Sequence, residues 1–158
     1  MTHEEEILNW ENTSEYMTFV LGSMKYAIEL PKIREILTYP EIVTTLPNTV
    51  GWVKGLINLR GEVVPILDLR IRFNTGEVEY NDNTAVIAVI TEDKRMIGIV
   101  VDKVDDVQRI DTTSLASVSE MGSAIPSKYL KGFVRLNNNE MLVIMDIEMV
   151  VAKDELND

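Results

Sequence analysis

The stretch over residues 54–70, KGLINLRGEVVPILDLR, limits the possible folds more than any other part of the sequence. It predicts two strands, at residues 56–59 and 63–69, joined by the turn residues Arg60-Gly61-Glu62. The second strand is apolar at every position from 63 to 67 instead of alternating with polar residues, so both of its faces are predicted to be covered. In a small barrel, such a strand requires a second packed layer outside the barrel.

A related pattern returns near the C-terminus as KGFVRLNNNEMLVIMDI, over residues 131–147. Lys54 aligns with Lys131, and Asp68 aligns with Asp146 after one extra residue in the second turn. The flanking residues Gly55, Leu56 and Ile66 align with Gly132, Phe133 and Ile144.

A second pair of segments, YAIELPKIREI from Tyr26 and IGIVVDKVDDV from Ile97, occurs in the same order. Four positions of the two segments align as follows: Ala27 with Gly98, Lys32 with Lys103, Ile33 with Val104, and Ile36 with Val107. Two repeats in the same order predict a duplicated β unit, with chance similarity between aliphatic strands as the alternative.

The remaining glycine, proline and aspartate residues predict further short elements. Two strands are expected around Gly22-Ser23, and a second hairpin is expected from residues 85–90 and 96–101. Residues 32–37 fit either a strand or a helical turn. Pro47 and Pro126 each fit the start of a single helical turn. Asp68 and Asp146 are each expected to cap a short helix, and the helix after Asp146 is expected to reach about residue 156.

The chain is therefore predicted to be all-β, with a mobile acidic tail over residues 1–14 and one domain over residues 15–152. This domain is expected to contain a first β unit at about 15–80 and a second at about 81–150, followed by a C-terminal end at 153–158. Residues 74–83 are polar and are predicted to be an exposed linker between the halves.

Composition excludes several classes of function. With 26 acidic and 15 basic residues the net charge is −11, so nucleic acid is not an expected partner. The sequence has no cysteine, which rules out disulfides and thiolate sites. No signal peptide and no apolar run long enough to cross a bilayer is evident, so we expect a soluble, cytoplasmic protein without membrane insertion.

Residues for catalysis are also missing. The single histidine, His3, lies in the predicted tail, so no Ser-His-Asp arrangement or histidine-based metal site is expected. No phosphate-binding glycine motif is present. The acidic residues between 102 and 111 lack the spacing of a calcium loop, and a solvated acidic strand edge is the favoured interpretation. We expect no enzyme activity, catalytic residue, cofactor or metal.

The motifs GLINLRGEVVPILDLR, YAIELPKIREI, YNDNTAVIAV and GIVVDKVDDV together resemble the CheW family of bacterial chemotaxis adaptors. The resemblance covers about residues 16–151. It implies two SH3-like five-stranded β-barrels packed on a shared hydrophobic core, with short helical turns and a short C-terminal helix. It also implies an adaptor that couples the regulatory domain of the histidine kinase CheA to the helical hairpin at the cytoplasmic tips of chemoreceptors, at membrane-associated arrays.

The same resemblance implies that the receptor is held in the groove between the barrels, at seven positions: Ile33, Glu35, Gly55, Asn58, Arg60, Gly98 and Val101. The glycines would let a helix approach, Ile33 and Val101 would offer apolar area, and Arg60 would bond to a receptor carboxylate or carbonyl. The alternative is structural: a solvated turn residue, a barrel corner and ordinary core.

In the second copy, three asparagines at residues 137–139 replace Arg60-Gly61, so receptor binding is assigned to the first hairpin.

Two other functions remain as alternatives. A relative of the CheA regulatory domain or of CheV is disfavoured by the length, because no receiver domain or kinase segment accompanies the domain. A hydrolase would need a nucleophile and base that are not evident.

Overall fold

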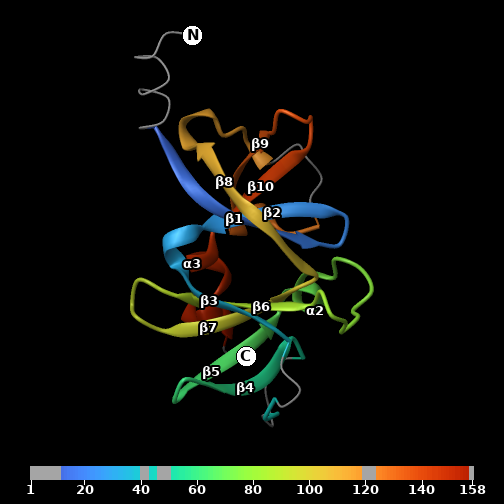
Figure 1. Ribbon diagram of the computed structural model, residues 1–158, viewed down its shortest axis with the longest axis vertical. Helices are drawn as coiled ribbons and strands as arrows, with labels where there is room; N and C mark the ends of the chain where they lie inside the picture. The colour runs from blue at the N-terminus through green and yellow to red at the C-terminus, as the bar shows by residue number, and fades with distance from the viewer. Residues whose placement is uncertain (1–11, 40–42, 46–50, 119–123, 157–158) are drawn as a thin grey trace.

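The computed structural model describes residues 12–39, 43–45, 51–118 and 124–156, and they form two five-stranded sheets (Figure 1). Sheet A has the order β8-β1-β2-β10-β9, and sheet B has the order β3-β6-β7-β5-β4. The strands of sheet A are β1 (Thr13–Leu21), β2 (Met24–Glu29), β8 (Lys103–Asp111), β9 (Leu130–Arg135) and β10 (Met141–Met145). Those of sheet B are β3 (Ile33–Thr38), β4 (Val53–Leu59), β5 (Glu62–Asp68), β6 (Ala85–Ile90) and β7 (Met96–Val101).

The helical segments are short. They are η1 (Leu30–Lys32), α2 (Leu69–Phe73), η2 (Thr112–Ser114), η4 (Ser127–Tyr129), α3 (Ile147–Val150) and α4 (Lys153–Leu156). No helix among the described residues is long and apolar enough to cross a membrane.

The strand pairing confirms the duplicated β unit. Replacing each strand by its repeat-related strand converts the order of one sheet into the order of the other. The two parallel pairings also correspond, because Ile144 lies beside Ala27 in sheet A and Ile66 lies beside Gly98 in sheet B. Each sheet nevertheless takes strands from both copies: β1 and β2 join β8, β9 and β10, whereas β3, β4 and β5 join β6 and β7.

Most predicted local elements are confirmed. Both predicted hairpins around Gly22-Ser23 and over residues 85–101 form. The ambiguous segment 32–37 resolves into the turn η1 followed by the strand β3. The carboxylates of Asp68 and Asp146 accept hydrogen bonds from the backbone N–H groups of Arg70 (3.0 Å) and Met149 (3.3 Å), as expected of helix caps.

The prediction of one C-terminal helix up to about residue 156 is wrong. Val151 has non-helical backbone angles (φ −107°, ψ 18°) and a fully buried side chain, and it separates α3 from α4. The helical turn expected at Pro126 is present as η4. The turn expected at Pro47 and residues 1–11 of the predicted tail lie outside the described residues.

Three apolar clusters hold the sheets. The largest lies between them and includes Phe19, Ile28, Leu67, Ile99 and many others; we call it the shared core. Each sheet also has a smaller cluster on its other face, one around Leu142 and Ile144 in sheet A and one around Val64 and Ile66 in sheet B. Burial of this area is the main stabilising contribution to the fold.

The prediction that both faces of strand β5 are covered is correct for one part of the strand and wrong for another. Ile66 faces the cluster of sheet B and Leu67 faces the shared core, so both faces are covered there. At Val63 the prediction is wrong, because this side chain is 67% exposed. The β4–β5 hairpin projects at the end of the molecule farthest from sheet A (Figure 1), beyond the reach of the second layer.

Candidate functional site

The tip of the β4–β5 hairpin is a tight two-residue turn with a defined geometry. Arg60 and Gly61 both have positive φ, at 52° and 87°, as in the mirror-image turns that match strand twist. The side-chain oxygen of Asn58 accepts a hydrogen bond from the Gly61 N–H at 2.9 Å. Asn58 therefore has a local role in fixing the turn, and the turn directs Arg60 outwards.

Arg60 is paired with Glu35 of the neighbouring strand β3. Its Nε lies 2.7 Å from a carboxylate oxygen of Glu35, and the two side chains are 80% and 27% exposed. The hydrogen bond that Arg60 donates to Glu35 raises the pKa of Arg60, so the guanidinium stays charged. Only Nε is engaged among the described residues, which leaves the terminal nitrogens free to bind a carboxylate or carbonyl of a partner.

A hollow of about 340 Å³ lies beside this pair, between the start of β3 and the end of the hairpin. Its lining combines charge with apolar surface: Arg34, Glu35, Leu59, Arg60, Glu62 and Met96. The structure thus brings two of the seven predicted residues, Glu35 and Arg60, together at this hollow, and a third, Asn58, fixes the turn that carries Arg60.

The two predicted glycines lie inside sheet B, on either side of Ile66. A methyl group on Gly55, whose φ is 139°, would overlap the Thr44 carbonyl oxygen. One on Gly98 would lie 2.6 Å from Ile66 Cδ1 and 2.8 Å from Val86 Cγ1. The space in front of both glycines is therefore filled by the chain's own atoms. The expected reason for these glycines, room for an approaching helix, is replaced by internal packing.

Val101 is fully buried in the shared core and Ile33 is half-buried at its edge. Val101 thus offers no apolar area to a partner, in contrast to the expectation from sequence, whereas Ile33 retains some. Val101 was misjudged because an apolar residue at a strand end has the same local pattern whether it is buried or exposed.

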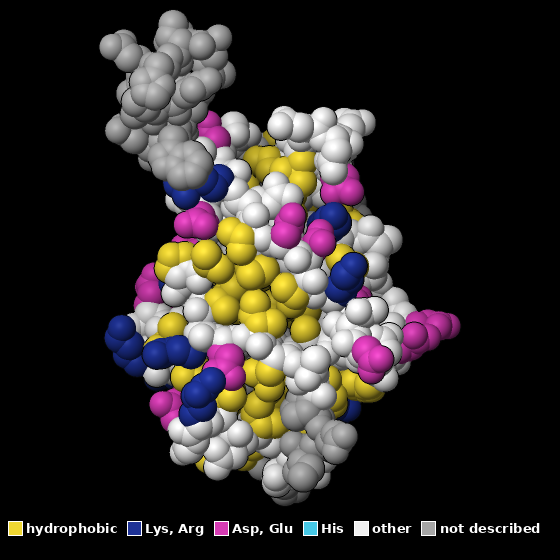
Figure 2. All heavy atoms as spheres, viewed as in Figure 1, with side chains coloured by type: hydrophobic (Ala, Val, Ile, Leu, Met, Phe, Trp, Pro, Cys, Tyr) yellow, Lys and Arg dark blue, Asp and Glu magenta, His cyan; other side chains and the backbone are white. Residues whose placement is uncertain are grey.

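Two of the exposed apolar residues lie on edge strands and were not selected as candidate site residues from the sequence. Ile36 of β3 and Val107 of β8 are 38% and 44% exposed, on edge strands of different sheets. The half-buried Ile33 and Val104 of the same two strands pack against the shared core. Figure 2 shows a patch of apolar side chains in the middle of one face of the molecule, the face that β3 and β8 cross in Figure 1. The repeat alignment pairs Ile36 with Val107, and this match was the sequence signal that could have identified both residues.

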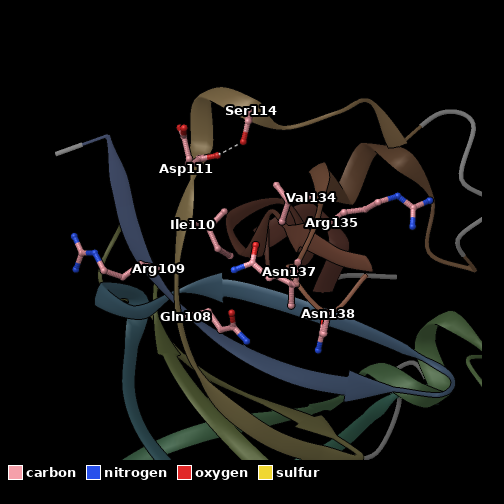
Figure 3. A pocket seen from close by; sticks show the side chains of 10 residues that line it. Gln108, Arg109, Ile110, Asp111, Ser114, Val134, Arg135, Asn137 and Asn138 are labelled. Carbon is pink, nitrogen blue, oxygen red and sulfur yellow. Dashed lines mark hydrogen bonds between the residues drawn. The ribbon is translucent and has the colours of Figure 1, made fainter. Parts of the chain in front are cut away.

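The corresponding end of sheet A is chemically different. A hollow of about 460 Å³ lies between the end of β8 and the β9–β10 turn. Figure 3 shows the amides of Gln108 and Asn137 near it, while the guanidinium groups of Arg109 and Arg135 point away. The three asparagines at residues 137–139 stand where the first copy has Arg60-Gly61, so this end has no counterpart of the Arg60–Glu35 pair among the described residues. Those residues also contain no group of three or more acidic, histidine or cysteine side chains placed to hold a metal ion.

Comparison with known proteins defines the class to which this arrangement belongs. The model of the CheW-like domain matches residues 15–155, nearly the whole chain, and the chain belongs to this family.

Individual relatives support the same assignment. The chemotaxis protein CheW of Klebsiella aerogenes is 38% identical over 142 residues, covering 90% of this chain and 84% of that protein. CheW of Bacillus subtilis is 30% identical over 138 residues, covering 87% and 86%. The fold is similar to that of the scaffolding protein TtCheW from Thermoanaerobacter tengcongensis, with a TM-score of 0.79 at 23% identity, over 90% of this chain and 95% of that one. The chain is a chemotaxis adaptor of the CheW type.

Proposed function

We propose that this chain couples the histidine kinase CheA to the cytoplasmic tips of chemoreceptors and catalyses no reaction of its own. The observation that carries the proposal is the exposed Arg60, held on a tight turn by Asn58 and oriented by Glu35 at 2.7 Å. A charged group fixed in this way loses little side-chain entropy when it binds. Family membership supplies the class of partner.

The receptor contact in this proposal is a strip on β3 and the hairpin tip, which we call the receptor strip: Ile33, Glu35, Asn58 and Arg60. A helix of the receptor hairpin lays apolar residues against Ile33 and the neighbouring Ile36, and offers a carboxylate or carbonyl to Arg60. Gly55, Gly98 and Val101 contribute from within, because their packing fixes the strands that carry the strip.

We also infer that each sheet closes into an SH3-like barrel. Each sheet has a separate apolar cluster on the face away from the shared core, and a sheet that curls around such a cluster removes it from water. The chain leaving edge strand β3 pairs at Thr44 with Leu56 of β4, the strand at the opposite edge. Ala116 and Phe133 repeat this bridge between the ends of sheet A. Partial pairing across the two edges favours closure.

The kinase contact is assigned to the regulatory domain of CheA, and the working location to the cytoplasm at receptor arrays. Both assignments rest on the family and not on residues of this chain. Nucleic acid remains an unexpected partner because the net charge is −11, and insertion into a membrane is not part of the proposal.

The test is co-sedimentation of the chain with a receptor signalling fragment and CheA. We expect a ternary complex in which kinase activity rises when this chain is added, and no turnover of ATP by the chain alone. Sedimentation with CheA but not with the receptor fragment would reject the adaptor function and favour a stand-alone regulatory domain.

A further inference from the structure

The chain passes between the two sheets at only two points within the described residues. It leaves sheet A after β2 through η1, and it leaves sheet B after β7 at Asp102. Each crossing leads directly into an edge strand, β3 or β8. The first crossing therefore determines where the receptor strip begins, because Ile33 is the first residue of β3.

Few backbone or apolar contacts fix this first crossing. The turn η1 has no buried residue, and Glu29 at its start makes no side-chain cap. The pairing of β3 with β6 is irregular between Ile33 and Glu35, so the ladder does not set the position of one relative to the other. At the start of the crossing Glu29 pairs with Lys131 at 2.6 Å, and at its end the Ile33 N–H donates to the Leu30 carbonyl within the turn. Ile33 also contacts the shared core, but none of these contacts joins the end of η1 to sheet B.

Lys32 makes that connection. Its Nζ lies 2.8 Å from Glu148 of α3, which follows sheet A, and 3.5 Å from Glu92 in the β6–β7 turn of sheet B. The backbone N–H of Glu92 also donates to the Glu148 carboxylate, at 3.2 Å. The side chains of Lys32 and Glu148 are 19% and 30% exposed, and hydrogen bonding to Glu148 raises the pKa of Lys32. One lysine thus connects the crossing to both sheets.

We propose that Lys32 is a positioning residue for receptor binding: its ion pair with Glu148 fixes Ile33 and Glu35 in the arrangement that the receptor helix meets. This inference rests on the proposed role of the receptor strip. Lys32 itself does not touch the receptor, and the loss of its charge acts through the backbone that follows it.

The first measurement uses the free protein and needs no partner. Lys32→Met keeps most of the apolar stem and removes the charge. We expect amide chemical-shift changes and faster hydrogen exchange at Ile33, Arg34 and Glu35, with a melting temperature close to that of the wild type. Lys103→Met is the matched control, because the repeat places Lys103 at the start of β8, where its side chain is exposed and forms no ion pair with the described residues. It should leave those amides unchanged.

The second measurement is the affinity for a receptor signalling fragment. We expect Lys32→Met to bind on the order of fivefold more weakly, Lys32→Arg to recover most of the loss, and affinity for the CheA regulatory domain to stay constant. Unchanged amides at Ile33–Glu35 in Lys32→Met would overturn the inference, even with weaker binding, since Lys32 would then contact the receptor directly.

A third variant, Ile33→Asp, separates this inference from the proposed function. If Lys32→Met shifts the amides without changing receptor affinity while Ile33→Asp weakens binding, the positioning role is rejected and the receptor strip stands. If neither variant changes receptor affinity, the strip is not the receptor contact, and both proposals fail.

Discussion

Each copy of the repeated unit forms an ion pair where the chain crosses between the sheets, which we call a joint: Arg70–Asp102 is the buried joint and Lys32–Glu148 the partly exposed joint. The positions of the positive and negative residues are exchanged between the two joints. Arg70 and Glu148 are repeat-related, each being the second residue after a capping aspartate. Arg70 is 1% exposed, donates to both carboxylate oxygens of Asp68 (3.0 and 2.9 Å), and lies 3.2 Å from Asp102. Glu148 is 30% exposed and pairs with Lys32.

Both joints also receive a backbone N–H from a hairpin turn of the other sheet. Gly22 N–H donates to Asp102 at 2.8 Å, and Glu92 N–H donates to Glu148. In both copies a carboxylate accepts the backbone N–H of a hairpin turn, and a cation pairs with that carboxylate. The second residue after the capping aspartate is the cation in one copy (Arg70) and the carboxylate in the other (Glu148). What differs is burial, which decides how much of the fold depends on each joint.

The largest effect is expected at the buried joint. Arg70→Met leaves Asp68, which is 0% exposed, without its cation and should reduce the free energy of unfolding by about 3–5 kcal/mol. Glu148→Gln, at the partly exposed joint, should cost less than about 1 kcal/mol. Urea unfolding followed by circular dichroism measures both. Equal losses would show that burial does not distinguish the two joints, and Arg70→Lys serves as a milder variant should Arg70→Met not fold.

The next effect compares the glycines at the bases of the two repeated hairpins. Gly55 and Gly132 both have positive φ, at 139° and 155°. A methyl group on Gly132 would lie 2.8 Å from the Ala116 carbonyl oxygen, a lesser overlap than the one between Gly55 and Thr44. We expect Gly55→Ala to cost about 2–3 kcal/mol and Gly132→Ala about 1–2 kcal/mol, measured by the same unfolding experiment. The reverse order would mean that the bridge at Ala116 is the more rigid one.

These comparisons show what the sequence could and could not predict. Local periodicity and turn residues located β6 and β7 at their observed bounds, and the repeat alignment matched Ile66 with Ile144 before any pairing was known. The assignment of strands to sheets was not predictable, because β2 pairs with β10 more than a hundred residues away and local patterns carry no information on such contacts. For the same reason the sequence could not distinguish the exposed Arg60 from the buried Arg70 and Val101.

A smaller effect compares the two hairpin tips. Arg60→Glu places a negative charge beside Glu35 and should weaken binding of a receptor signalling fragment about tenfold. Its melting temperature should remain near that of the wild type because the side chain is 80% exposed. Asn138→Glu puts the same charge at the tip in the second copy and should leave receptor binding unchanged. Isothermal titration calorimetry and a thermal melt test both variants, and a large drop in the melting temperature of Arg60→Glu would identify Arg60 as structural.

The smallest effect concerns the hairpin turns that dock on the joints. The β6–β7 turn contains Asp93, whereas the β1–β2 turn contains only Gly22-Ser23. Hydrogen bonds from the Thr91 hydroxyl and from Arg95 lower the pKa of Asp93 to about 2, from an ordinary value of 3.8.

Because this pKa is lower in the folded state, the unfolded state binds the proton first as the pH falls. The stabilisation from Asp93 is therefore complete above about pH 4 and is lost as the pH falls towards 2. A carboxyl-carbon NMR titration should give the low pKa in the wild type, and Thr91→Val should move it towards the ordinary value. Unfolding at pH 5 and pH 3 should show a smaller difference for Asp93→Asn than for the wild type. An ordinary pKa for Asp93 in the folded wild type would mean that the β6–β7 turn is held no more tightly than the β1–β2 turn.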